Sequence, residues 1–590
     1  MLKKSIFLFG LFFLLCQGFA QVSVDVFDPF YEDLINWENK GLITDTPLMW
    51  PLPLQEVERI LDLVKEIGDE RDRRLATEHY ERFFGRFIRG GAKLDFGFGY
   101  VQGNNFYINA TPVVDLNYKL AKYLSVGLQF LLDLTNKTPN EEPLPQFLTS
   151  NRDISNDDVR VGSFKVLPSF NSGVTVGTAE YYFSAQISRT SYGHFRDLGI
   201  FVSRSVPKQG VFSLVINKPL FSVNSSLLML ATTDDFGKNL GPNKYLSIHS
   251  FYVRPLDWIS FGVIDSVIFG GRFEPIYLVP FSFYFVSQGM FGFPDNSVLG
   301  FDFSIKPIDG LNISGAIYMD DMGFNEIVQF KSAKARMSGE FGISYTMPKK
   351  SWFRSVSFDY TFVTPYTYTH LTNEHTSNLN YQSYTHSGKN VGTNLEPNSD
   401  RFYLKAEFEP IDPIRISLTN TLVRHGNINE SITDPLFLFK YMTEKYNTDG
   451  SVLNHAGIWV GNIRKDTLLY SNPFLKQSII NYVYQLSLDF SCHLPIRRSG
   501  GHIQAYLGYC FEADINSGVS HAMFYESTIS KQWSGAKWEE VVSGTFNVNG
   551  NTFTTADIIA ERDRQVQEWK TKATGKKFNH YVKLGLSFTY

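Results

Sequence analysis

From Lys93 to its last residue, the chain alternates apolar and polar positions with a period of two. Residues 310–319 and 580–590 show this alternation most clearly. Because successive side chains of a β-strand point to opposite sides, the pattern predicts strands with one apolar and one polar face. We count eighteen such strands, including 158–165 and 175–189, and an even number is expected of a bacterial outer-membrane barrel.

The predicted connections alternate in length along the chain. Those after even-numbered strands are short, as at 166–174 and 307–309, whereas most of those after odd-numbered strands are long, as at 364–399, 425–477 and 514–579. Short turns at one end and long loops at the other are typical of outer-membrane barrels. The expected fold class is therefore an all-β transmembrane barrel of about 18 antiparallel strands.

Two segments precede the alternation. Residues 1–20 have a basic start, an apolar core and small residues before Gln21, which are the features of a secretory signal peptide. Apolar residues recur at helical spacing in 31–43, 53–68 and 73–88. The expected organisation has three parts, which are a cleaved signal peptide (1–20), a periplasmic helical region (21–90) and an outer-membrane β-barrel with long extracellular loops (91–590).

The amino-acid composition is typical of a chain in contact with lipid. Aromatic residues make up 15% of the sequence and charged residues only 19%, whereas soluble domains carry about 25% charged residues. The net charge of −4 gives no basis for a nucleic-acid partner. The last strand ends on the aromatic Tyr590, which resembles the signal that outer-membrane proteins present to the barrel-assembly machinery. We expect that machinery and outer-membrane lipid as partners, and a monomer.

The cysteines give a separate test of the strand register. Cys16 lies in the signal segment, where the bulky Phe13 and Leu15 disfavour a lipoprotein anchor. In the predicted strands, Cys492 lies on an apolar face and Cys510 on a polar one. Side chains on opposite faces cannot approach closely enough for a disulfide, so we expect two free thiols.

The motifs between residues 191 and 322 resemble, in their order, those of the Wzi capsule-assembly family, as does the opening segment 22–61. A strand ends in Arg-Pro-x-Asp-Trp, a Gly-Arg stretch precedes Tyr-Leu-x-Pro-Phe, and a Leu-Gly-x-Asp strand is followed by Asp-Asp. The motif residues, which we expect to be structural, are Arg254, Asp257, Trp258, Arg272, Tyr277, Pro280, Asp302, Asp320 and Asp321. The resemblance implies an eighteen-stranded outer-membrane barrel with a periplasmic helical bundle. It also implies a role in holding or organising capsular or exported polysaccharide at the cell surface.

The long loops supply candidate glycan contacts. In 364–399, tyrosines alternate with Thr, Asn, His and Gln, and sugars are bound by aromatic faces together with amide and hydroxyl groups. The candidate residues are Tyr366, Tyr368, Tyr381, Tyr384 and, in the loop 425–477, Trp459. The alternative is an aromatic girdle that continues into a polar loop.

We find no motif that predicts an enzyme. The sequence lacks a nucleophile elbow, a phosphate loop and a His-Glu-x-x-His pattern, and the spacing of His370, His375 and His386 fits no common zinc site. We therefore expect no catalytic residues, no metal and no cofactor. A porin-like channel for small solutes is the alternative function, in which the lumen would be lined by residues such as Lys405, Glu407, Asp489 and Gln504.

Overall fold

The computed structural model describes most of the chain. The described residues are 25–86, 88–100, 104–153, 159–195, 199–233, 240–293, 295–320, 336–365, 367–368, 381–426, 474–496, 501–519, 533 and 535–590. The expected signal peptide lies outside these residues.

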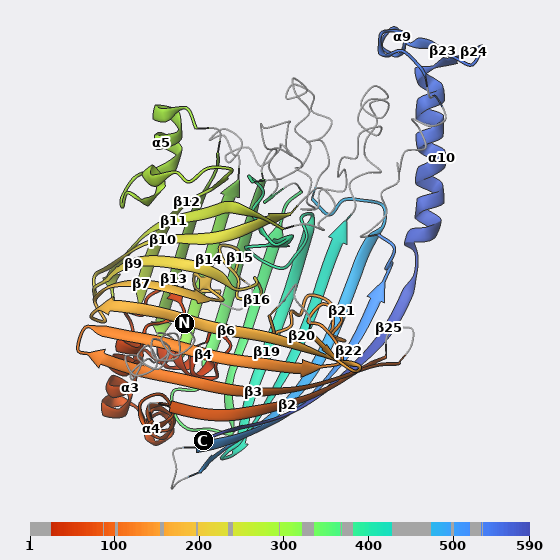
Figure 1. The fold of residues 1–590 in the computed structure, drawn as a ribbon. Coiled ribbons are helices and arrows are strands. Elements are labelled where there is room, and N and C mark those ends of the chain that lie inside the picture. Colours follow the sequence, from red (N-terminus) through yellow and green to blue (C-terminus); the bar gives the residue numbers. More distant parts are fainter. Residues whose placement is uncertain are drawn as a thin grey trace, which may run out of the picture.

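Antiparallel strands form a closed barrel, as the alternation predicts (Figure 1). Each strand of the wall pairs with its neighbours in sequence, and β25 closes the ring on β2, with Phe588 opposite Ala92. The eighteen wall strands are β2 (Ile88–Tyr100), β3 (Asn104–Ala121), β4 (Leu124–Thr135), β6 (Phe164–Gly177), β7 (Tyr181–Ser188), β9 (Gln209–Asn217), β10 (Phe221–Thr233), β11 (Leu240–Leu256), β12 (Ile259–Gly270), β13 (Asn296–Ile308), β14 (Leu311–Asp320), β15 (Arg336–Thr346), β16 (Phe353–Val363), β19 (Ser399–Ile411), β20 (Ile414–Gly426), β21 (Ile480–Ile496), β22 (Gly501–Ile515) and β25 (Lys576–Thr589).

The two sides of the wall differ in polarity. On β13, Leu299 and Phe301 point outward and are exposed, whereas Asp302 and Ser304 point into the lumen and are buried. An apolar exterior around a polar interior is the sidedness of barrels that span a membrane. Tight turns such as that between β13 and β14 lie at one end, here called the short-turn end, and the longer connections lie at the other, the long-loop end.

One pair of predicted strands is wrong. Residues 158–165 and 175–189 were expected as strands joined by a turn at 166–174, but β6 runs without a break from Phe164 to Gly177, and only the short β5 (Val159–Val161) precedes it. The residues taken for a turn are polar because Ser169 and Asn171 line the lumen. Pro168 is tolerated because the register places it beyond the last β5 pair and before the first β7 pair, so β4 is its only partner strand.

Three helices form a cap at the short-turn end. They are α2 (Phe30–Asn39), α3 (Leu54–Ile67) and α4 (Glu70–Phe84), close to the ranges that the apolar spacing predicts. Phe30, Trp37 and Ile60 belong to a fully buried core within this cap. None of the helices that the structure describes is long and apolar enough to cross a membrane.

A buried ionic cluster joins the cap to the wall. Asp33 of α2 accepts hydrogen bonds from Arg354 of β16 and, at 3.1 Å, from Arg415 of β20, and lies 2.7 Å from Nε2 of His79. Burial alone would raise the pKa of Asp33, but Arg415 and Arg354 outweigh it and hold the pKa well below its ordinary value. The carboxylate is therefore ionised at neutral pH.

A second extension follows β22. Helix α9 (Trp538–Val542), the hairpin β23 (Thr545–Val548) and β24 (Asn551–Thr554), and helix α10 (Thr555–Ala573) project beyond the long-loop end in Figure 1. We predicted only a long loop here. A capping box of Thr554 and Asp557 begins α10, and such a pair is a sequence signal for a helix start.

The cysteine prediction is confirmed. Cys492 and Cys510 are both free, and their register partners are Ala505 and Ser487. Cys510 is buried, with its thiol on the lumen side of β22.

We predict that Asp33→Ala loosens the cap. The substitution removes the buried carboxylate that Arg354 and Arg415 share, and breaking a buried ion pair costs about 3–5 kcal/mol. Arg354 keeps a second carboxylate, Glu409, at 3.7 Å. Protease cleavage between residues 25 and 86 of the purified protein should become faster. The control is Asp62→Ala, which removes an ion pair to Lys65 from a carboxylate that is 60% exposed and should change little.

The same cluster predicts a pH dependence. Since the folded pKa of Asp33 lies below its unfolded value, its contribution to docking is complete above about pH 4 and is lost as the pH falls through the lowered folded value. Equal cleavage rates for the wild type and Asp33→Ala at neutral pH would contradict the assigned role.

Candidate functional site

The loop between β7 and β9 folds into the lumen and meets a strand from the N-terminal region. There, β8 (Ser191–Tyr192) pairs with β1 (Met49–Trp50), and the amide of Tyr192 donates to Val202 O at 2.9 Å. Ile200, Phe201 and Val202 are fully or almost fully buried. Gly300 on the inner face of β13 permits this packing, because a β-carbon there would lie 2.6 Å from the Phe201 ring.

A second inward segment lies against the first. The loop between β16 and β19 contains the small hairpin of β17 (Thr385–His386) and β18 (Lys389–Asn390). It is joined to the first segment where the amide of Ser203 donates to Val391 O at 2.9 Å, and to the wall where Lys244 Nζ donates to Thr385 Oγ1 at 3.0 Å. We call the described residues 189–195, 199–208 and 381–398 the plug, since they fill part of the lumen with packed side chains.

Two of the candidate glycan-binding tyrosines belong to this packing. Tyr368 and Tyr384 are fully buried and stack on each other with ring centroids 5.5 Å apart. Their hydroxyls donate to Ile200 O and Phe201 O, both at 2.9 Å. Burial raises the pKa of both phenols well above the ordinary value, so they remain neutral donors. In this arrangement neither ring offers a face to an external sugar, and a role of the pair in glycan contact stays a prediction.

The remaining candidates are placed differently. Tyr381 is partly buried, and its ring lies close to Gly270 at the end of β12. Tyr366, Trp459 and the motif residue Asp321 lie outside the described residues. Their expected roles stay predictions.

Three motif residues hold inward segments against the wall. Arg254 donates to Lys218 O at 3.0 Å and to Thr46 O at 3.2 Å, which ties the N-terminal region to β11. Asp302 lies 3.0 Å from Nε2 of His194 in the plug. Asp320 accepts a hydrogen bond from the amide of Tyr368 at 2.9 Å. These contacts are structural ones.

The other motif residues lie at the surface or in the β12–β13 connection. Asp257 and Trp258 are exposed at the tight turn after β11, where an aromatic residue suits a membrane interface. Arg272 forms an ion pair with Asp295 at 2.5 Å, and Tyr277 donates to the same carboxylate at 2.8 Å. Pro280 is exposed in the connection.

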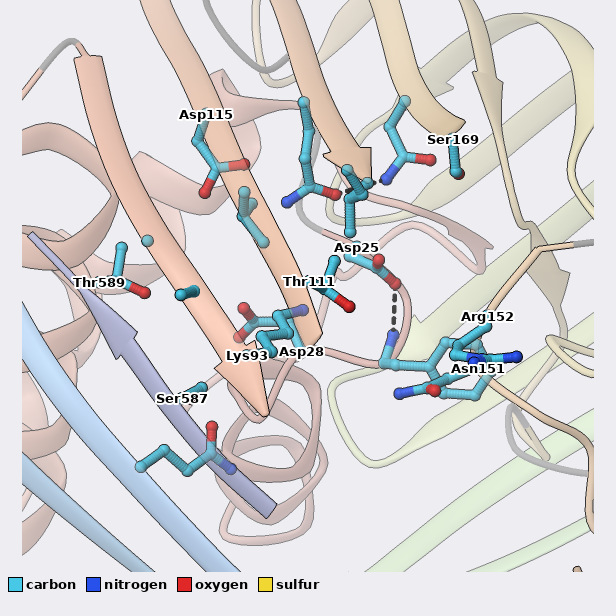
Figure 2. A pocket seen from close by; sticks show the side chains of 18 of the residues that line it. Asp25, Asp28, Lys93, Thr111, Asp115, Asn151, Arg152, Ser169, Ser587 and Thr589 are labelled. Carbon is cyan, nitrogen blue, oxygen red and sulfur yellow. Dashed lines mark hydrogen bonds between the residues drawn. The ribbon is translucent and has the colours of Figure 1, made fainter. Parts of the chain in front are cut away.

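Beside the plug lies a polar cavity of about 370 Å³. Its walls come from the inner faces of β2, β3, β4, β6, β22 and β25, and residues 25–29 and 151–153 close its sides. Figure 2 shows Lys93 and Asp115 on neighbouring strands, with Ser169, Asn151 and Arg152 around the same space. Its size is within the range of small-ligand sites, about 300–1,000 Å³.

Ionic and hydrogen-bonding groups line the cavity together with apolar ones. Asp133 accepts from Asn109 at 3.1 Å and Thr111 at 2.5 Å, and Lys208 pairs with Asp153 at 2.5 Å. These contacts hold the side chains in fixed positions. Acceptors, amides and cations at fixed positions can bind a molecule rich in hydroxyl groups.

Arg89 is one of several cavity residues with an unpaired buried polar atom. It is buried, and its Nε atom has no hydrogen-bond partner in the described part of the chain. Lys93, four residues further along the same face of β2, is exposed to the cavity. Burial would raise the pKa of Asp28 on the opposite side, but Arg82 outweighs this and lowers it. Arg152 Nε and Arg189 Nε, on the other side of the same cavity, are also donors without a hydrogen-bond partner among the described residues.

Sequence reasoning did not find this cavity. It did place Lys405, Glu407, Asp489 and Gln504 on polar strand faces, and Gln504 lines the cavity while Lys405 and Glu407 pair at 2.8 Å beside a second lumen pocket. The available sequence signal is the set of polar positions in β2 to β6. These positions predict which side chains face the lumen, but they do not predict which other segments close the cavity.

The molecule is thus a capped, partly plugged barrel of eighteen strands. No protein-family model and no curated protein matches the sequence. Among solved structures the chain is similar to Wzi of Escherichia coli, an outer membrane protein involved in group 1 capsule assembly and described as a carbohydrate-binding β-barrel. The two share 12% identity with a TM-score of 0.52 over 96% of this chain and 99% of that one. At this identity the likeness shows the fold.

Weaker similarity extends to two proteins of Pseudomonas aeruginosa. OprD shares 7% identity over 85% of this chain and 95% of its own, and OpdK shares 6% over 85% and 98%, each with a TM-score of 0.37. These values support no further inference.

We predict that loosening the plug raises conductance. Replacing both Tyr368 and Tyr384 with Ala removes the stacked pair and two hydrogen bonds to the plug backbone, and aromatic-to-alanine changes in cores cost about 3–5 kcal/mol each. In planar bilayers the double variant should open more often than the wild type, which should conduct poorly. Tyr482→Ala, on the outer face of β21, is the control. A wild type with steady, porin-like conductance would refute the plug as a barrier.

Proposed function

We propose that this protein is an outer-membrane barrel that binds, anchors or organises capsular or exported polysaccharide at the cell surface, without turnover. The observation that supports it most is the match to Wzi over nearly the whole of both chains, which includes the N-terminal region as well as the wall. Export through a cleaved signal peptide and contact with outer-membrane lipid are parts of the same proposal.

The lumen cavity is the proposed place of saccharide contact among the described residues. Its fixed carboxylates and amides can accept and donate hydrogen bonds to sugar hydroxyls, and Arg89 and Lys93 add donors for hydroxyl or carboxylate oxygens. In this proposal Tyr384 is a plug residue and Tyr368 holds the plug by its hydrogen bond to Ile200 O. Tyr366 and Trp459 stay candidates.

A channel for small solutes is the second candidate, favoured by the polar lumen. The packed plug and the helical cap argue against it, because both occupy space that a solute path requires. Paired charges such as Lys208–Asp153 also hold the lumen residues in place rather than leave them to a passing ion.

We predict that loss of the protein releases polysaccharide. Deleting the gene should raise the shed fraction of surface polysaccharide and lower the cell-bound fraction, measured after washing the cells. Unchanged retention would remove the proposed role.

The cavity itself is tested by Arg89→Ala combined with Lys93→Ala, expressed in the deletion strain. Losing hydrogen bonds from two charged donors costs about 1.5–3 kcal/mol each, so retention should fall toward that of the deletion. Lys537→Ala, a change at an exposed lysine of the outer extension, is the matched control. If the double variant is present at normal levels and retains polysaccharide fully, the cavity is not the contact site.

A further inference from the structure

The connection between β12 and β13 folds over the outside of the barrel. We call its described residues 275–293 the flap; they comprise a 3₁₀ turn, η1 (Pro275–Leu278), and helix α5 (Tyr284–Phe291), which lies outside the wall in Figure 1. On β12, Phe261 and Val263 are exposed on the outer face, while Val267 and Phe269, on the same face, are fully buried beneath the flap. Both faces of this part of β12 are therefore covered.

Polar residues on the outer wall explain why the flap is attached there. Ser247, His249 and Asp265 point outward from β11 and β12, where a lipid-facing polar group would be costly. Each has a partner in the flap. Asp265 accepts from the amide of Tyr284 at 2.6 Å, His249 Nδ1 lies 3.0 Å from Ser282 O, and Ser247 donates to Tyr277 O at 2.7 Å.

These contacts set how far the flap reaches along the wall. Asp265 lies near the middle of β12 and pairs across the sheet with His249 and Leu299. Leu299 is exposed and belongs to the band of apolar side chains on the outer face of the wall, here called the outer belt. The backbone at Ser282–Tyr284 is therefore level with the belt and not above it.

The side of the flap that faces away from the wall is apolar, whereas the surface of a soluble protein is rich in charged and polar residues. Helix α5 turns Tyr284 and Ser287 toward the wall and its apolar residues away from it. The exposed apolar side chains, with their exposed fractions, are Leu278 (39%), Val279 (52%), Phe281 (67%), Phe283 (65%), Phe285 (78%), Val286 (55%), Met290 (73%) and Phe291 (53%). No charged residue occurs between Pro275 and Pro294. Large contiguous apolar patches on a protein exterior mark contact with a membrane or a partner.

We propose that the flap is embedded in the membrane leaflet at the long-loop end and that its apolar side binds lipid acyl chains. The occupant is lipid, because the patch continues the outer belt at the same level and the polar side chains of Tyr284 and Ser287 face the wall. The charged pair Arg272–Asp295 lies at the base of the flap, which places it where strands leave the hydrocarbon. The proposal rests on the barrel being in a membrane and is independent of any glycan.

Spin labels test the position of the flap. In a Cys492→Ser, Cys510→Ser background, nitroxides are placed at Phe285→Cys and Met290→Cys, and the protein is reconstituted in phosphatidylcholine vesicles. Collision rates with oxygen, which partitions into hydrocarbon, and with a water-soluble nickel chelate give an accessibility ratio. Both flap labels should show an oxygen-to-nickel ratio several-fold higher than a label at Lys537→Cys.

The belt label Phe301→Cys separates the possible failures. Flap labels that match Phe301→Cys support the proposal. Flap labels that match Lys537→Cys, with Phe301→Cys still in lipid, overturn the proposal and leave the membrane barrel standing. Flap labels inaccessible to both quenchers also overturn it, since a second copy or another protein would then cover the patch. An aqueous ratio at Phe301→Cys would refute the membrane barrel itself.

Discussion

Closure of the backbone ladder between β2 and β25 is the constraint on which the rest of the structure depends. In hydrocarbon, each unsatisfied amide or carbonyl costs several kcal/mol, so a sheet that spans a membrane must leave no open edge. The ten registered pairs between Gly91–Tyr100 and His580–Thr589 remove that edge. Once the ring is closed, every strand residue faces either lipid or lumen, and the period of two decides which.

That division holds only where one face is left to the lipid and the other to water. In the halves of β11 and β12 nearest the long-loop end, this division does not hold on either face, because the plug covers the inner face and the flap covers the outer one. Ile264 and Ile268 are buried against the plug while Val267 and Phe269 are buried beneath the flap. Apolar residues on the lumen side and polar ones such as Asp265 on the outer side are consistent with these covers.

The wall could be predicted from the sequence because its physical signal is local. The closed barrel, the three cap helices and the separation of the two thiols all follow from spacing within short segments. The β6 error arose because Ser169, Asn171 and Pro168 resemble turn residues, whereas their roles depend on which strands lie alongside. Tyr368 and Tyr384 have the composition of a sugar-binding loop, but their burial depends on Ile200 and Phe201, more than 160 residues away. No local pattern contains that contact.

The pairing of charged groups in the lumen also helps to distinguish a binding role from a conducting one. A conducting lumen needs charged groups that interact weakly enough with an ion to release it. Here Asp33 is neutralised by two arginines and Asp153 by Lys208, and Asp133 accepts hydrogen bonds from Asn109 and Thr111, so these three carboxylates are held by internal partners. Donors such as Arg89 and Lys93 remain beside acceptors that are held in place. Fixed donors and acceptors suit the saccharide contact proposed above better than they suit the passage of solutes.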